Sequence, residues 1–234
     1  TRYSGVSWAR RCVEETDYYD GQGFMVPKKL GVKSAKELDG ASVCIQTGTT
    51  TELNLAEFFA GNNMKYNPVP IETNAEAQEL YKAGRCDVYT TDASGLYATK
   101  MSFDNPDAHM VLPEIVSKEP LGPVVRHGDD QWADIVSWVL RAMMSAEEKG
   151  ITSKNVKKLA AQDNKDKEIN RLLGKDPLQG LSKLGLSADW AVNVISQVGN
   201  YAESFERNLY PLTIVRGMNA LYRDGGLHYI PPIK

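Results

Sequence analysis

The stretch CIQTGTTTELNLAEFF (44–59) decides the fold of this chain. It starts as a short apolar run, turns at Gly48, and continues as TTTELNLAEFF (49–59), where apolar residues recur at helical spacing. A buried strand that leads directly into a helix is half of a βαβ unit. The sequence therefore predicts a strand over 41–48 and a helix over 49–59.

The same pattern continues on both sides of this stretch. An interrupted strand is predicted over 18–26, where two glycines indicate a bend or a close backbone approach. Further strands are predicted over 66–73, 86–92 and 109–115, and further helices over 74–84 and from 93 onward. Strands that alternate with helices are typical of a parallel, doubly wound sheet. We therefore predict an α/β unit over about residues 28–115.

The pattern changes after this unit. An extended stretch rich in Pro and Gly (117–131) precedes a strongly amphipathic helix over 130–150. A second long helix is predicted over 187–209, and another within 212–226. The C-terminal half is therefore expected to be mainly helical.

Composition narrows the class of protein. The 234 residues suffice for one to two domains, and 27 Lys and Arg against 30 Asp and Glu give a net charge of −3. This balance does not favour nucleic-acid binding, which usually shows a basic excess. No apolar run approaches the ~20 residues of a membrane span, so we expect neither a span nor a signal peptide.

The charge is unevenly distributed. Residues 30–114 hold 6 basic and 12 acidic side chains, whereas the rest of the chain holds 21 and 18. This split suggests two units of different surface character, although chance would also account for it.

The turn around Gly48 is the first candidate site. Backbone N–H groups at a helix N-terminus attract an anion, and the hydroxyls of Thr49 and Thr50 add donors. The Gly-Lys-Ser/Thr ending of a P-loop is absent, so a carboxylate fits better than a triphosphate. The alternative is a simple threonine N-cap.

Asp92 is the second candidate. It ends the predicted strand 86–92, and ligands of open α/β sheets gather beyond the carboxyl ends of strands. A carboxylate opposite an anion-binding helix end suits a zwitterion with one ammonium and one carboxylate group. The alternative is that Asp92 only caps the following helix.

The sequence allows two interpretations of Cys44 and Cys86. Cys44 and Cys86 each lie at the start of a predicted strand of one sheet, within disulfide range if these strands are neighbours. The alternative is two buried thiols, and Cys12 is left over in either case. No histidine accompanies them at metal spacing, and no Ser-His-Asp arrangement is visible, so we predict no metal, no cofactor and no hydrolytic triad.

Several long blocks carry a family resemblance. They are YYDGQGFMVPKKLGVKSAKELDG (18–40), CIQTGTTTELNL (44–55), AGRCDVYTTDASGLY (83–97), SKEPLGPVVRHGDDQW (117–132) and GNYAESFERN (199–208). Together they closely resemble the general L-amino-acid-binding proteins of bacterial ABC importers, in the polar amino-acid group of periplasmic solute-binding proteins. The resemblance runs from about Tyr18 to Lys234.

This resemblance implies a type II periplasmic-binding-protein-like α/β fold, with a ligand cleft between two lobes. Residues 28–116 look like one complete, doubly wound lobe. Residues 1–27 look like a remnant of the other lobe with the first hinge strand, and 117–234 like the second hinge strand with the C-terminal, helix-rich part of that lobe.

The resemblance also assigns ligand contacts. It implies that Gly48, Thr49 and Thr50 bind the ligand α-carboxylate, with Thr50 as the hydroxyl donor, and that Asp92 accepts the α-ammonium group. It favours a Cys44–Cys86 disulfide, because the periplasm is oxidising.

The sequence departs from the family at its start. Family members begin with a long first-lobe segment that this sequence lacks, and that segment supplies the other wall of the cleft and an arginine for the carboxylate. Arg2 is the candidate counterpart of this arginine. Two outcomes are open: a homodimer or element swap that covers the exposed surface, or a shortened form with weak or absent binding.

We therefore expect a periplasmic protein without catalytic activity that binds L-amino acids and delivers them to an ABC-type membrane permease. One alternative is a non-binding remnant or interaction protein. A less favoured alternative is a dehydratase-like enzyme on the same fold, for which Glu119 is the only nearby general acid that the sequence offers.

Overall fold

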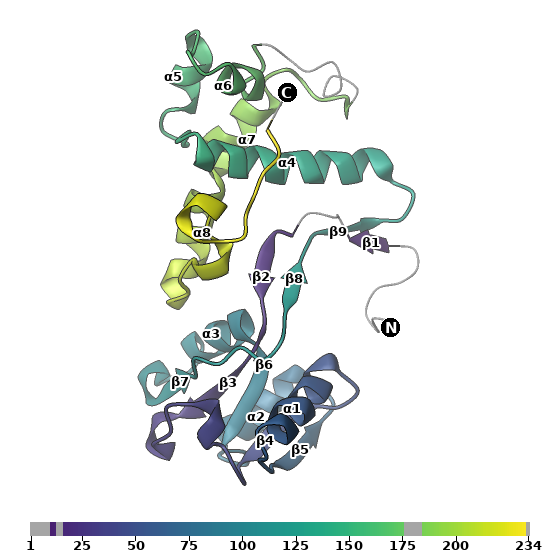
Figure 1. Cartoon of the computed structure of the whole chain (residues 1–234), viewed down its shortest axis with the longest axis vertical. Coiled ribbons are helices and arrows are strands. Elements are labelled where there is room, and N and C mark those ends of the chain that lie inside the picture. The colour runs from purple at the N-terminus through teal and green to yellow at the C-terminus, as the bar shows by residue number, and fades with distance from the viewer. Residues whose placement is uncertain (1–9, 13–15, 176–183, 233–234) are drawn as a thin grey trace. The chain divides into compact units, whose positions relative to one another are not determined.

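The computed structural model describes residues 10–12, 16–175 and 184–232 of the chain (Figure 1). Its strands are β1 (Arg10–Cys12), β2 (Tyr18–Asp20), β3 (Gln22–Pro27), β4 (Ser42–Gln46), β5 (Asn67–Ile71), β6 (Val88–Asp92), β7 (His109–Val111), β8 (Glu119–Leu121) and β9 (Val124–Arg126). Its α-helices are α1 (Thr50–Gly61), α2 (Asn74–Lys82), α3 (Ala93–Met101), α4 (Asp130–Glu148), α5 (Val156–Ala161), α6 (Lys167–Leu172), α7 (Trp190–Val198) and α8 (Tyr201–Leu209).

The chain divides into two compact units. Unit 2 is the continuous segment Tyr19–Pro120, and unit 1 combines Thr1–Tyr18 with Leu121–Lys234. The chain passes between the units at β2 and β8, which pair with each other as a two-stranded sheet. In the described part of the chain, no helix is long and apolar enough to cross a membrane.

Unit 2 is built on a five-stranded sheet of order β5-β4-β6-β3-β7. β4 runs parallel to β5 and β6, whereas β3 runs antiparallel to both of its neighbours, β6 and β7. The strands predicted within residues 28–115, namely β4, β5, β6 and β7, therefore share one direction as predicted, whereas β3, from the strand predicted over 18–26, runs antiparallel between two of them. The strands that belong to βα repeats share one direction, and β3 differs because it enters from β2 without a preceding crossover helix.

Two apolar clusters cover the two faces of this sheet. On one face, Phe24 and Val88 pack with Leu55 and Phe59 of α1. On the other face, Met25 and Tyr89 pack with residues of α2 and α3. Because successive side chains of a strand point to opposite faces, alternate residues of β3 and β6 belong to alternate clusters.

The interrupted strand predicted over 18–26 forms two strands separated at Gly21. A Cβ atom at Gly21 would lie 2.3 Å from the Ile115 side chain and 2.6 Å from the Ser117 carbonyl oxygen. The predicted close backbone approach is therefore confirmed, and it requires glycine at this position.

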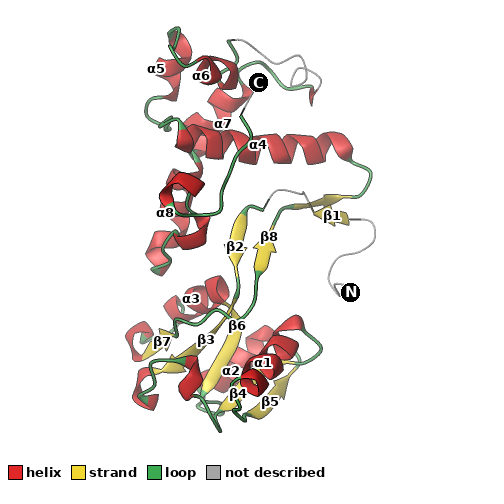
Figure 2. Cartoon of the chain, in the orientation of Figure 1, coloured by secondary structure: helices red, strands yellow, loops and turns green. Residues whose placement is uncertain are grey.

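Unit 1 is mainly helical in its described part (Figure 2). α4 confirms the amphipathic helix predicted over 130–150, and its Ala142 and Ala146 pack in a core with Ile195 of α7. The single helix predicted over 187–209 is wrong, because α7 ends at Val198 and α8 begins at Tyr201. Gly199 has a φ of 89°, and Asn200 forms a capping box with Glu203 that starts a new helix.

The helix predicted within 212–226 is also wrong. This stretch contains only short 3₁₀ turns, at Tyr210–Leu212, Gly217–Asn219 and Tyr222–Asp224. Gly217 and Gly225 have positive φ angles, 48° and 87°, which are incompatible with a continuous α-helix.

Candidate functional site

The candidate site begins where β4 leads into α1. Thr49 is the N-cap of α1: its hydroxyl accepts from the Glu52 amide at 3.3 Å and donates to the Gln46 carbonyl oxygen at 2.8 Å. The capping interpretation of this turn is thus confirmed for Thr49. Its hydroxyl is fully engaged within the protein, so it stabilises the helix start.

Gly48 shapes the turn. Its φ of 70° lies in the left-handed region, where glycine avoids the steric cost of a side chain. Its amide donates to a Glu52 carboxylate oxygen at 2.8 Å. An internal carboxylate therefore already occupies one of the backbone donors predicted for a ligand.

Thr50 and Thr51 leave donors available. Thr50 is the first residue of α1 and is exposed. Within the described residues, no acceptor contacts the amides of Thr50 and Thr51 or the Thr50 hydroxyl. These amides are among the first N–H groups of a helix, which have no partner inside it and carry its partial positive charge.

Asp92 lies at the end of β6 and at the N-cap position of α3. Its side chain makes no capping hydrogen bond. Asp20 performs that role: its carboxylate accepts from the Ser94 hydroxyl at 2.5 Å and from the Ser94 amide at 3.4 Å. The interpretation of Asp92 as a simple helix cap is therefore wrong.

The electrostatic surroundings of Asp92 favour a cationic partner. Burial raises the pKa of the Asp92 carboxyl, and repulsion from Asp20 and Glu119 raises this pKa further. Glu119 accepts from the Ser117 hydroxyl at 2.9 Å and Asp20 is bonded to Ser94, whereas the Asp92 carboxylate has no hydrogen-bond or ion-pair partner among the described residues. A cation beside Asp92 would relieve both the burial and the repulsion.

The turn and Asp92 share one edge of the sheet. β4 and β6 are parallel neighbours, with Val43 opposite Val88 and Cys44 opposite Tyr89. Continuing this register places Asp92 level with Thr47, on strands that lie about 4.8 Å apart. The start of α1 and the Asp92 carboxyl thus meet beyond the carboxyl ends of adjacent strands.

Two polar residues at this edge of the sheet, Gln22 and Asp20, were not predicted from the sequence. Gln22, which lies opposite Asp92 in the β3–β6 ladder, donates through its side-chain amide to the Thr51 carbonyl oxygen and to the Thr90 hydroxyl. Asp20 is buried beside Ser94. A glutamine at the start of the apolar run of β3 was the available signal for Gln22, but its partners depend on a register that the sequence does not reveal.

Arg2 lies outside the described residues, and only the backbone of Cys12 is described, in β1.

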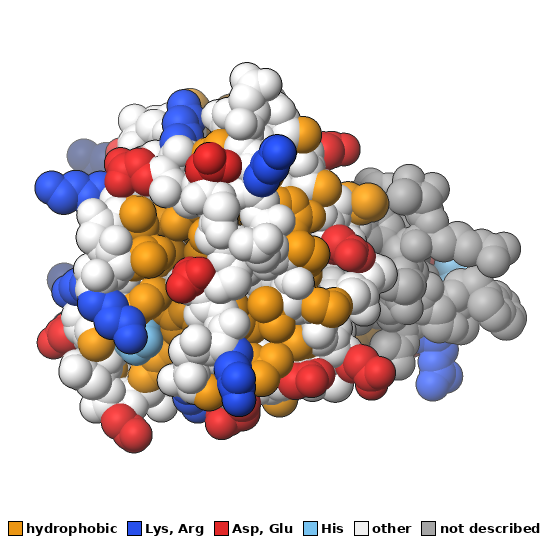
Figure 3. Space-filling view, turned by 90° about the horizontal axis from the view of Figure 1, so that it is seen from below, with side chains coloured by type: hydrophobic (Ala, Val, Ile, Leu, Met, Phe, Trp, Pro, Cys, Tyr) orange, Lys and Arg blue, Asp and Glu red, His pale blue; other side chains and the backbone are white. Residues whose placement is uncertain are grey.

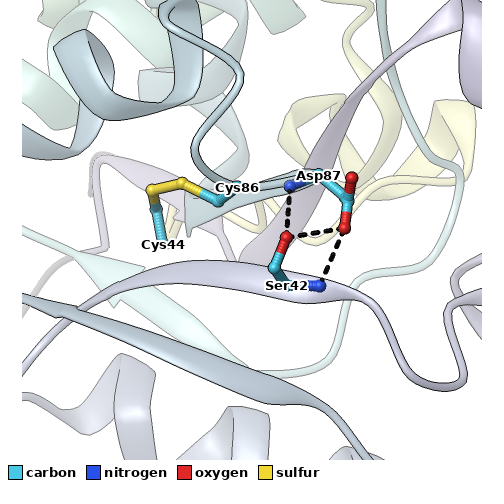
Figure 4. Close-up of a disulfide and its surroundings, with 4 residues drawn as sticks. All are labelled: Ser42, Cys44, Cys86 and Asp87. Atoms are coloured by element: carbon cyan, nitrogen blue, oxygen red, sulfur yellow. Dashed lines mark hydrogen bonds between the residues drawn. A yellow bond between two sulfur atoms is a disulfide. The ribbon is translucent and has the colours of Figure 1, made fainter.

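The other two cysteines form the disulfide Cys44–Cys86, with a Cα–Cα distance of 5.6 Å (Figure 4). Next to it, the Asp87 carboxylate accepts from the amide and hydroxyl of Ser42, at 2.9 and 2.6 Å. The disulfide and this network join β4 to the segment that leads into β6.

The described residues offer no arrangement for a metal, because no three His, Cys, Asp or Glu side chains among them could hold an ion together. Charged side chains of both signs are interspersed among apolar ones on the face drawn in Figure 3. The described part of this face therefore carries no continuous basic patch of the kind that nucleic acids recognise.

Known proteins similar to this chain are bacterial binding proteins, although no family model matches it. The chain is 58% identical over 221 residues to the general L-amino acid-binding periplasmic protein AapJ of Rhizobium johnstonii, covering 93% of this chain and 64% of the relative. It is 54% identical to the glutamate/glutamine/aspartate/asparagine-binding protein BztA of Rhodobacter capsulatus, covering 93% of this chain and 65% of the relative. It thus spans slightly less than two thirds of the length of these curated relatives.

A solved structure agrees with these relatives. The structure of an ABC transporter periplasmic binding protein from Brucella ovis, with glutathione bound, superposes with a TM-score of 0.90 at 49% identity. The match covers 98% of this chain and 73% of that one. The predicted type II periplasmic-binding-protein-like α/β fold is confirmed, and the chain belongs to the family of periplasmic binding proteins of ABC transporters.

Proposed function

We propose that this chain binds L-α-amino acids and delivers them to the membrane permease of an ABC importer. Both curated relatives are named as amino-acid-binding proteins, one of general L-amino acids and one of glutamate, glutamine, aspartate and asparagine. The proposed delivery to a permease is supported by membership in a family of ABC transporter binding proteins, and it would require no covalent chemistry.

The proposed site uses opposite charges on two elements of unit 2. The ligand α-carboxylate lies at the start of α1 and accepts from the Thr50 hydroxyl and the amides of Thr50 and Thr51. The ligand α-ammonium lies against Asp92. Gly48 and Thr49 shape the turn, and direct contact of the Gly48 amide requires Glu52 to release it.

One observation carries the proposal: the Asp92 carboxyl is partly buried, has no partner among the described residues, and lies beside a helix start whose Thr50 and Thr51 amides have no acceptor among those residues. A buried anion without a partner is unfavourable, and a ligand ammonium would supply the missing one.

Location in the periplasm fits the proposal. A disulfide joins two of the three cysteines of the chain, and disulfides persist in oxidising compartments. Both the name of the Rhizobium relative and the description of the Brucella structure place those proteins in the periplasm.

Isothermal titration calorimetry with a panel of L-amino acids tests the proposal. Glutathione belongs in the panel, because its glutamyl residue carries a free α-ammonium and α-carboxylate group. Asp92→Asn should weaken binding at least about thirtyfold, since loss of one partner of a desolvated charge pair costs about 2 kcal/mol or more.

Asp104→Asn is the matched control, because Asp104 is an exposed aspartate of the same unit. This variant should bind like the wild type. Absence of binding heat with every member of the panel, on protein whose fold is verified by circular dichroism, would contradict the proposal.

A further inference from the structure

Gln22 is a polar residue in an apolar strand. It lies in β3 before the fully buried Phe24, Met25 and Val26, and its own exposed fraction is 1%. A buried amide loses its hydration, so its presence requires compensation or a functional reason.

The strand register places Gln22 beside the candidate site. Gln22 is directly opposite Asp92 in the β3–β6 ladder. Directly opposed residues on one face of an antiparallel pair have Cβ atoms about 5 Å apart. Phe24 packs in the cluster of α1, so strand alternation puts Gln22 on the α1 face too.

The side-chain amide of Gln22 joins both halves of the site. Its nitrogen donates to the Thr51 carbonyl oxygen at 3.1 Å and to the Thr90 hydroxyl at 2.9 Å. The Thr90 hydroxyl donates in turn to the Gly23 carbonyl oxygen at 2.7 Å, so it must accept from Gln22. A single NH₂ group therefore ties the first turn of α1 to the strand that ends at Asp92.

A contribution to the stability of the fold does not explain why a glutamine is present at position 22. The Gln22 side-chain oxygen is buried and has no hydrogen-bond partner among the described residues, which is unfavourable. Thr90 keeps its bond to Gly23 without Gln22. An apolar side chain of similar length would avoid the unpaired oxygen.

We propose that Gln22 is a positioning residue that fixes the spacing between the carboxylate-binding start of α1 and the Asp92 carboxyl. This inference rests on the proposed function, because it concerns the same site. One carbon separates the two charged groups of an α-amino acid, and two carbons separate those of a β-amino acid. A fixed spacing therefore selects α-amino acids over β-amino acids.

The first test compares L-alanine with β-alanine by calorimetry, with L-glutamate and β-glutamate as a second pair. In Gln22→Met, the preference for the α-amino acid should fall at least tenfold, while the melting temperature stays equal or rises. Gln197→Met replaces an exposed glutamine of α7 and should keep the wild-type preference. An unchanged preference in Gln22→Met would overturn the positioning role.

The second test needs no ligand. Hydrogen exchange of the Glu52–Leu55 amides, which are hydrogen-bonded at the start of α1, should be faster in Gln22→Met than in the wild type, while exchange in β4 stays the same. A wild type that binds no amino acid would contradict the proposed function, and this exchange measurement would still decide the role of Gln22. Unchanged exchange at the start of α1, or loss of the fold in both Gln22→Met and Gln22→Leu, would overturn the inference.

Discussion

Asp92 differs from its two acidic neighbours in having no partner. Asp20 is bonded to Ser94 and Glu119 to Ser117, so each has a hydroxyl donor. Asp92 has no such donor among the described residues, and its pKa is raised by burial and by repulsion from both neighbours. The protein thus holds a carboxylate in a position that is unfavourable without a cation.

Replacement of Asp92 should therefore stabilise the ligand-free protein while it weakens binding. At pH values between the ordinary aspartate pKa and the raised pKa of native Asp92, this carboxyl is protonated more often in the native state than in the unfolded chain. The free energy of unfolding consequently falls as the pH rises through this window, and the cost is complete above it. Asp92→Asn removes the cost, so its melting temperature at neutral pH should exceed that of the wild type.

Thermal unfolding of both proteins over a pH series measures this effect. The difference in melting temperature should shrink toward acid pH, where Asp92 is protonated in the native wild type. A variant that melts below the wild type at neutral pH would show that ionised Asp92 is stabilising and that the reasoning about its surroundings is wrong.

Residue types alone marked Asp92 and the threonine turn as candidates, but they did not indicate which threonine hydroxyl caps the helix. Thr49 and Thr50 are adjacent and chemically identical, and only the structure shows that the Thr49 hydroxyl is used in capping. Gln22 was missed because its partners, Thr51 and Thr90, lie far from it in the sequence. Short-range patterns reveal helix ends, whereas contacts across a sheet depend on long-range register.

At the scale of elements, the βα repeats were predictable because each strand and helix has its own local signal. β4 lies within the range 41–48 that was predicted for it. α1 begins within its predicted range, 49–59, and extends two residues beyond it. The break between α7 and α8 was missed because apolar spacing continues across Gly199, although the Asn200–Glu203 capping box is itself a local signal. The place of β3 between β6 and β7 was not predicted, because it depends on how the chain enters the unit.

The disulfide is expected to be the main covalent stabiliser of unit 2. Cys44 and Cys86 are 42 residues apart in sequence, and closing a loop of that length in the unfolded chain stabilises a protein by about 4 kcal/mol in the chain-entropy model. The double variant Cys44→Ala/Cys86→Ala should therefore lower the denaturant midpoint of unit 2.

The chain supplies an internal reference for this measurement. No tryptophan occurs in residues 19–120, so tryptophan fluorescence reports unit 1, whereas hydrogen exchange in β4 and β6 reports unit 2. We expect protection in β4 and β6 to fall much more than the fluorescence midpoint shifts. Equal protection in the variant and the wild type would show that the bond adds little to stability.

At the scale of the whole molecule, the proposed ammonium and carboxylate contacts all lie in one continuous segment. Asp92 and the start of α1 both belong to unit 2, within Tyr19–Pro120. The chain spans 64% and 65% of the length of its two curated relatives. The ligand contact assigned to Arg2 stays a prediction, and so does the homodimer, which was one of two outcomes that the sequence left open. A light-scattering mass decides whether the homodimer forms.

Recognition of the α-ammonium group by Asp92 is the central claim, and a pair of ligands that differ only in that group tests it most directly. L-alanine and L-lactate share a carboxylate and a methyl group, but lactate has a hydroxyl in place of the ammonium. By calorimetry, the wild type should prefer L-alanine at least about thirtyfold, as expected for a desolvated charge pair. Asp92→Asn should weaken L-alanine binding, leave L-lactate binding nearly unchanged and thereby abolish the preference. A preference that persists in Asp92→Asn, or a folded wild type that prefers lactate or binds neither ligand, would contradict the account.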